Sequence, residues 1–186
     1  MKSFHALPHF NKYAWQGGPT LPDPKTGWVI LNPGGGHPGN DQQHAAIRRW
    51  VAPRDGVFAI TGTLVHNQDQ GDGVQARIVS SRSGVVGTWT VQNSKKDTAV
   101  RRLEVKRGDT VDFVVDCRTG PNFDAYAWDP TIRLVGQPAA AKEGERVQWT
   151  ASTDFSGPQA RPASALGPWE KYAQVLLLSN EFAFVD

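Results

Sequence analysis

Residues 48–82, RRWVAPRDGVFAITGTLVHNQDQGDGVQARIVSSR, decide the fold of this chain. Over residues 57–65 apolar side chains alternate with small or polar ones, which is the period of a strand with one face on a core. Residues 68–73 are polar and rich in glycine, which indicates a turn, and the alternation resumes at residues 74–78. The side chains expected to face inward are Phe58, Ile60, Leu64, Val74, Ala76 and Ile78. Two strands joined by a turn need a second layer, which the rest of the chain must supply.

The composition is that of an all-β protein. The chain has 186 residues, enough for one domain with a sizeable core, and 19 glycines and 13 prolines separate its short apolar runs. We expect about eight strands between Trp28 and Val135, and one more within residues 147–151. This spacing predicts an antiparallel two-sheet sandwich. A jelly roll is the favoured topology and an immunoglobulin-like Greek key is the alternative, because sequence alone does not determine strand order.

Four regions are expected along the chain. Residues 1–25 form an irregular N-terminal arm, residues 26–151 the β-sandwich module, and residues 152–167 an extended linker. Residues 168–186 are predicted to form an apolar helix and tail, because Pro168 suits the first position of a helix and no helix breaker follows as far as residue 182. A helix that is apolar nearly all round needs a partner surface. We therefore expect it to pack on the sandwich, on a neighbouring domain or on a second copy.

Charge and cysteine content argue against several classes of protein. The net charge of +2 does not indicate a nucleic-acid-binding surface. Cys117 is the one cysteine, so no internal disulfide is expected, and its place at the end of a strand pattern predicts a buried thiol. The leucine run 176–178 is too short to span a membrane, and the first residues lack the apolar run of a signal peptide.

No catalytic motif is recognisable. The chain has no Gly-x-Ser-x-Gly elbow, and His37 and His44 lack the spacing of zinc ligands. It has no Cys-x-x-Cys-His motif, which attaches c-type haem. We therefore expect a protein that is not an enzyme and that carries no organic cofactor.

Aspartates beside glycines raise the question of a metal. Residues 69–73, DQGDG, are similar to a calcium loop but lack its downstream glutamate, and strands are expected on both sides. A hairpin turn is the simpler interpretation, since Asp and Gly suit turn geometry. A structural calcium ion held by Asp72 and Asp124 stays open as the alternative.

The aromatic content is the strongest functional signal. Seven tryptophans occur in 186 residues, and several lie beside polar loops. Sugars stack their CH-rich faces on aromatic rings while polar side chains bind their hydroxyls. Trp50 and Trp89 lie within strands and are expected to pack in the core. The candidate ligand-binding residues are Trp128, Tyr126, Asn122, Asp124, Trp28, Trp15 and His37. Trp128, which follows the polar loop of Asn122 and Asp124, is the foremost candidate.

Residues 167–186, GPWEKYAQVLLLSNEFAFVD, resemble the closing segment of planctomycete proteins that combine cytochrome-type domains with domains of unknown function. The region before it resembles a β-sandwich module of some of those proteins and is similar to non-catalytic carbohydrate-binding sandwiches. The motifs that carry this second resemblance are 36–39 (GHPG), 49–50 (RW), 52–53 (AP), 55–56 (DG), 71–74 (GDGV), 107–109 (RGD), 112–113 (DF) and 122–128 (NFDAYAW).

The resemblance implies two alternative functions. The first is a non-catalytic carbohydrate-binding module that targets a larger secreted or surface protein to a polysaccharide or oligosaccharide, outside the cytoplasm. The second is a structural module that docks on neighbouring domains of a cytochrome-associated protein. Fold similarity alone does not decide between them.

Overall fold

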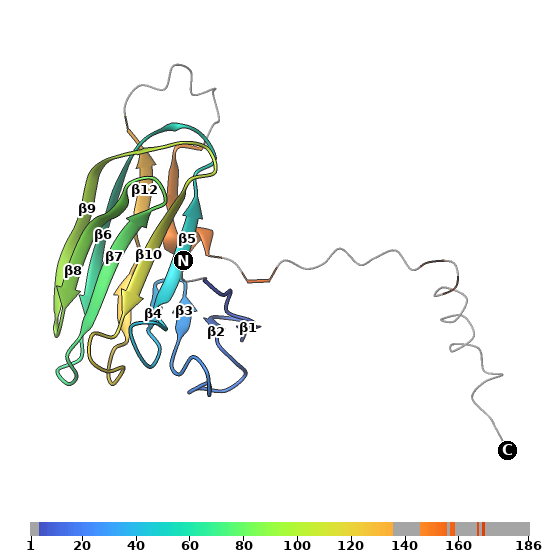
Figure 1. Cartoon of the computed structure of the whole chain (residues 1–186), viewed down its shortest axis with the longest axis vertical. Coiled ribbons are helices and arrows are strands. Elements are labelled where there is room, and N and C mark those ends of the chain that lie inside the picture. The colour runs from blue at the N-terminus through green and yellow to red at the C-terminus, as the bar shows by residue number, and fades with distance from the viewer. Residues whose placement is uncertain (1–3, 136–145, 156, 159–166, 168, 170–186) are drawn as a thin grey trace.

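The structure is a computed structural model, and it describes residues 4–135, 146–155, 157, 158, 167 and 169. The described part is a sandwich of two antiparallel sheets (Figure 1). The strands are β1 (His9–Phe10), β2 (Trp15–Gln16), β3 (Ile30–Asn32), β4 (Gly35–His37), β5 (Ala46–Val51), β6 (Gly56–His66), β7 (Val74–Ser80), β8 (Gly84–Val91), β9 (Ser94–Val105), β10 (Thr110–Asp116), β11 (Tyr126–Trp128), β12 (Thr131–Leu134) and β13 (Gln148–Thr150). The predicted all-β sandwich is confirmed.

The two sheets differ in size. The larger has the order β1-β2-β3-β4-β11-β6-β12-β13, and β9 pairs with the other edge of β6. Strand β6 is its centre, because β11 pairs with Leu64 and Val65 while β12 pairs with residues 58–61. The smaller sheet has the order β5-β10-β7-β8, so β5 and β8 are its edges. Consecutive strands from β4 to β7, and from β8 to β11, alternate between the two sheets, which is the connectivity of a jelly roll.

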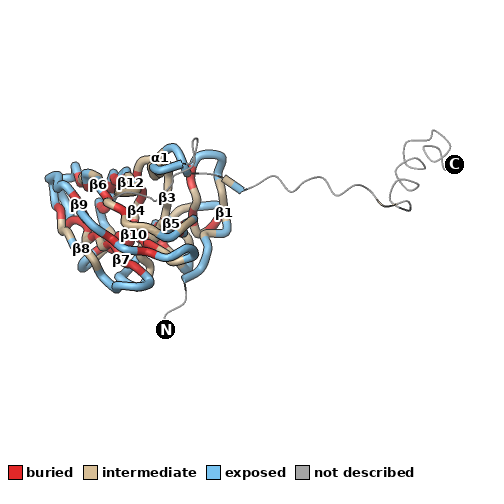
Figure 2. The backbone as a smooth tube through the Cα atoms, turned by 90° about the horizontal axis from the view of Figure 1, so that it is seen from above, coloured by how far each residue is buried: buried red, intermediate tan, exposed pale blue. Residues whose placement is uncertain are grey.

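The core lies between the facing surfaces of the sheets (Figure 2). The six side chains predicted to face inward from β6 and β7, namely Phe58, Ile60, Leu64, Val74, Ala76 and Ile78, are all fully buried. Trp50 and Trp89 pack against this core, as predicted from their place within strands. Cys117 is buried at the end of β10, which confirms the predicted role of its thiol. Alternation of apolar residues therefore located the core correctly.

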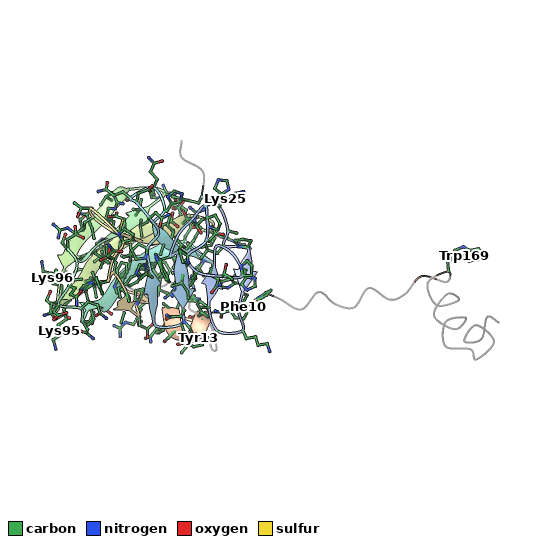
Figure 3. The ribbon with its side chains drawn as sticks, turned by 90° about the horizontal axis from the view of Figure 1, so that it is seen from below. Phe10, Tyr13, Lys25, Lys95, Lys96 and Trp169 are labelled. Carbon is green, nitrogen blue, oxygen red and sulfur yellow. The ribbon has the colours of Figure 1, made fainter. Side chains whose placement is uncertain are left out.

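The N-terminal arm, predicted as irregular, is in fact part of the larger sheet. Strand β1 pairs with β2, and β2 pairs with β3, so residues 9–16 extend the sheet beyond β4 (Figure 1). Phe10 packs on Trp15 with ring centroids 5.1 Å apart. Figure 3 places Phe10 at one margin of the sandwich and Lys95 and Lys96 of β9 at the opposite margin. The strands of the arm contain two residues each, too few to show a period.

Strand β4 begins within a run of three glycines, residues 34–36. A methyl group on Gly35 would lie 2.1 Å from the carbonyl oxygen of Tyr126, and one on Gly36 would lie 2.3 Å from that of Ile30. The glycines are thus required for close approach of neighbouring strands. Residues 94–98 begin β9, and residues 126–134 divide into β11 and β12.

One short helix, α1 (Ala151–Asp154), follows β13 at the start of the predicted linker. The chain then packs beside the arm, since the rings of Phe155 and Phe10 have centroids 6.4 Å apart. The predicted helix of residues 168–182 lies outside the described residues except for Trp169, which is exposed. Within the described part of the chain, no helix has the length and apolar character needed to cross a membrane.

Candidate functional site

Trp128, the foremost sugar-stacking candidate, lies in the core. Its side chain is 3% exposed, its indole Nε1 donates to Thr98 Oγ1 at 2.9 Å, and its ring meets Phe113 edge-on with centroids 5.4 Å apart. An indole enclosed in this way has no face left for a ligand. The prediction that Trp128 stacks on a sugar is therefore wrong.

Tyr126, like Trp128, lies in the core. It lies two residues before Trp128 in β11, so both rings point to the inner face, and Ala127 between them is exposed. The Tyr126 side chain is buried, and burial raises the pKa of its phenol. Its predicted role in binding is also wrong. The period of two in Tyr126-Ala127-Trp128 was a signal for this outcome, because a strand that enters the core after a polar loop buries alternate residues.

Asn122 and Asp124, the other two residues of the predicted loop site, differ in how far they are buried. Asn122 is exposed on the loop between β10 and β11, whereas the Asp124 side chain is 0% exposed. Burial, and then the charge of Asp72, raise the pKa of Asp124 to about 7. The loop therefore does not present Asn122, Asp124 and Trp128 to one ligand.

Trp28 and His37 come together on the surface. Trp28 is 43% exposed, and its ring lies 6.3 Å from that of His37, centroid to centroid. His37 Nδ1 donates to the carbonyl oxygen of Pro38 at 2.6 Å, and burial lowers the pKa of His37. These two residues form a small aromatic patch, but Trp28 and His37 do not line the hollows described next.

Trp15 is the predicted residue that lines a large hollow. A cavity of about 520 Å³ lies between edge strand β5 and the arm, lined by Trp15, Leu31 and Val29 with the polar side chains of Thr26, Gln43 and His44. A second cavity, of about 730 Å³, lies over the outer face of the smaller sheet, lined by Val79, Val85, Val114, Arg77, Arg118 and Thr119. Both cavities are also lined by Phe4, Gln43, Ala45 and Ile47. We call these two adjoining cavities, which share four lining residues, the β5 groove.

Two ion pairs stiffen the floor of the β5 groove. Asp112 and Asp116 lie on the outer face of β10, yet they are only 4% and 2% exposed because side chains of β5 and β7 cover them. Arg49 Nε and Nη2 donate to the two carboxylate oxygens of Asp112 at 2.7 and 2.8 Å. Arg77 Nη2 makes a single hydrogen bond within the described part of the chain, to Asp116 Oδ2 at 2.5 Å.

The electrostatics of these pairs follow from their contacts. The hydrogen bond with Asp112 raises the pKa of Arg49. Burial raises the pKa of Asp116, and the charge of Arg77 opposes that rise. A bidentate guanidinium–carboxylate pair fixes the direction of its remaining N–H groups. The groove thus has charged groups that are already oriented before a ligand arrives.

The two ion pairs in the floor of the β5 groove were not predicted from the sequence. Asp112 lies three residues after Asp109 in the chain. Arg49 is 63 residues away from Asp112, so the contact between Arg49 and Asp112 depends on the pairing of β5 with β10. The available signal was polar residues at alternate positions of a strand that is otherwise apolar, because such residues mark a solvent-side face that carries a function. Strand order was needed to know what lies beside them.

The groove combines apolar contact with oriented polar groups. Its apolar surface comes from an indole and from aliphatic side chains, and its polar surface from amide, imidazole and guanidinium groups. Cys117, which neighbours this region, is a poor nucleophile, because burial raises the pKa of its thiol to about 11. Among the described residues, no group of three or more His, Cys, Asp or Glu side chains is arranged to hold a metal ion.

Comparisons with known proteins give little information on this site. No protein-family model matches the chain, and no curated protein matches it. Among solved structures, the crystal structure of rabbit GITRL is similar, with a TM-score of 0.35 and 14% sequence identity. That match covers 49% of this chain and 74% of the rabbit chain.

Proposed function

We propose that this chain is a non-catalytic carbohydrate-binding module and that the β5 groove is its binding surface. The observation that carries the proposal is that two adjoining cavities share the lining residues Phe4, Gln43, Ala45 and Ile47. An extended groove suits a chain of sugar units better than a single small molecule. The proposed function is the one predicted from the sequence, but the proposed binding site is the β5 groove and not Trp128.

The lining supplies both kinds of contact that a sugar needs. Trp15, Leu31 and Ile47 offer apolar surface for the CH-rich faces of sugar rings. Gln43, His44 and Thr26 offer donors and acceptors at the rim. Such sites are mostly apolar with a few oriented polar groups.

Arg49 is the polar anchor of the proposed site. A guanidinium carries five N–H donors, and Arg49 uses two of them on Asp112. Its side chain is partly exposed beside the groove, and Phe4 lies over its guanidinium at 5.2 Å. Arg49 is thus held in place by a carboxylate and a ring while it faces the groove. We place this module in a larger extracytoplasmic protein, where polysaccharide is available.

A glycan array followed by retention on insoluble polysaccharide tests the proposal. We expect the protein to bind at least one polysaccharide, and Ile47→Arg and Gln43→Ala to weaken binding at least about tenfold, because both positions line both cavities. The matched control is Trp28→Ala, which removes an exposed aromatic ring outside the groove.

The results of these variants distinguish the β5 groove from the aromatic patch of Trp28 and His37. Binding that survives Ile47→Arg and Gln43→Ala but is lost in Trp28→Ala would assign the ligand to the patch of Trp28 and His37 and contradict the groove. The absence of binding to any glycan on the array would contradict the carbohydrate function itself.

A further inference from the structure

A second site lies where two loops meet at one end of the sandwich. Loop 67–73 joins β6 to β7, and loop 117–125 joins β10 to β11. His66 connects the second of these loops to the turn between β8 and β9: its Nδ1 accepts from the backbone N–H of Asn93 at 3.2 Å, and its Nε2 donates to the carbonyl oxygen of Phe123 at 2.9 Å. Because a backbone N–H can only donate, this arrangement places the ring proton on Nε2. His66 is therefore neutral, and both of its nitrogens are engaged.

Asp124 lies beside this imidazole without a hydrogen bond from it. The distance from Asp124 Oδ1 to His66 Nε2 is 3.8 Å, and the Nε2 proton is already donated to Phe123. Both carboxylate oxygens of Asp124 are buried and have no hydrogen-bond partner among the described residues. Burial of a carboxylate without partners is strongly unfavourable. The site therefore needs a positive charge or a proton to complete it.

A second carboxylate, that of Asp72, belongs to loop 67–73 and contacts loop 117–125. Asp72 Oδ2 accepts from the backbone N–H of Thr119 at 3.0 Å and from its hydroxyl, and Arg118 donates to the carbonyl oxygen of Asp72. The two loops are thus joined on the side of Thr119. Burial is the main cause of the raised pKa of Asp124, and the negative charge of Asp72 adds to it.

One backbone carbonyl group of loop 117–125, that of Asn122, lies against loop 67–73. Gly71 has a φ of 81°, and a methyl group there would lie 2.4 Å from the carbonyl oxygen of Asn122. Only glycine allows the loops to approach so closely. Both loops therefore bring oxygen atoms to their junction: the Asp72 carboxylate from one loop, and the Asn122 carbonyl and the Asp124 carboxylate from the other.

We propose that Asp124 and Asp72 bind a calcium ion between loops 67–73 and 117–125, with carbonyl oxygens of the loops as further ligands. Calcium accepts six to eight oxygen ligands, which include carboxylates, carbonyls and water, in flexible geometry. Zinc is less suitable, because it takes three or four His, Cys or carboxylate ligands and the described residues offer no such group. Magnesium retains several water molecules, which does not suit a carboxylate that is fully buried.

Thermal unfolding in metal-free buffer tests this site. We expect added CaCl2 to raise the melting temperature of the wild type in a saturable way, and MgCl2 at the same concentration to raise it less, because an ion that binds the native state stabilises it. Isothermal titration calorimetry should give one calcium ion per chain.

Three matched variants locate the ligands. Asp124→Asn keeps the shape of the side chain and should abolish the calcium response. Asp72→Asn should weaken calcium binding at least about tenfold, and it is informative even if Asp124→Asn does not fold. Asp69→Asn changes an exposed aspartate of the same loop and should keep the wild-type response.

Two results would contradict the calcium site or its assigned ligands. If millimolar calcium leaves the melting temperature unchanged, and the Asp124 carboxyl titrates near pH 7 in NMR spectra, a proton and not a cation completes the site and the proposal is overturned. If Asp69→Asn abolishes the response while Asp72→Asn keeps it, the assignment of ligands is wrong.

Discussion

Trp128 shows how burial changes the role of a residue beside a polar loop. Its indole donates to Thr98 and packs on Phe113, so it holds the two sheets together. We expect Trp128→Ala to lower the free energy of unfolding by about 3–5 kcal/mol, the usual cost of truncating a buried aromatic side chain. Urea unfolding measures this change.

Trp28→Ala is the control for that measurement. Because Trp28 is largely at the surface, its loss should change the free energy of unfolding by less than about 1 kcal/mol. Equal effects of the two substitutions would contradict the placement of Trp128 in the core.

The raised pKa of Asp124 predicts how the stability of the protein depends on pH. Its pKa in the folded protein is about 7, above the ordinary value of 3.8 for an aspartate, so the folded state holds a proton that the unfolded state releases. In metal-free buffer, this group should therefore stabilise the protein fully below about pH 4, and the contribution should decline as the pH rises to 7 and be absent above it. Unfolding of the wild type and of Asp124→Asn between pH 4 and pH 8 measures the difference. A wild-type profile parallel to that of the variant would contradict the raised pKa.

At the scale of elements, strand β4 depends on its glycines. A methyl group on Gly35 would collide with the backbone of Tyr126, which cannot move away without breaking the pairing of β4 with β11. We expect Gly35→Ala to destabilise the protein by more than about 2 kcal/mol, since overpacking of a closely packed site costs about 1–3 kcal/mol or more.

The neighbouring glycine provides the matched control. A methyl group on Gly34 would meet no atom within 4 Å, so Gly34→Ala should change the melting temperature little. If both variants unfold at the temperature of the wild type, the close contact between β4 and β11 is wrong.

Elements with a clear period could be predicted from the sequence, and the others could not. The alternation over β6, β7 and β10 located their strands and inward faces, because one face of each must be apolar. Strands β1 and β2 have two residues each, and β4 consists of two glycines and a histidine, so none of them carries a pattern. Their pairing depends on tertiary contacts.

The candidate site was predictable only in part for the same reason. Trp15 was expected among the ligand-binding residues and lines the β5 groove. Arg49 and Asp112 meet only because β5 pairs with β10, and Arg77 meets Asp116 only because β7 does. Trp128 was misplaced because a polar loop before a strand does not reveal which face of the strand follows it.

At the scale of the whole molecule, the described residues form one sandwich core. Its core cluster contains residues from Ala46 to Ile132, with Trp149 packed against it. We expect a chain that lacks residues 165–186 to keep the β-rich circular dichroism spectrum and the melting temperature of the full chain. Light scattering should show that it is at least as monodisperse as the full chain. Loss of the folded spectrum would show that the terminal segment is an integral part of the core.

The groove is a property of the whole molecule, because the arm, β5, β7 and the loop after β10 all line it. The most direct test of its function is a titration of the 15N-labelled protein with the best glycan from the array, followed by amide NMR. We expect saturable shifts in residues 43–47, 77–79 and 114–119, with little change at Trp28 and His37. Shifts confined to Trp28, His37 and their neighbours, or no saturable shift at any amide, would contradict the proposed function of the groove.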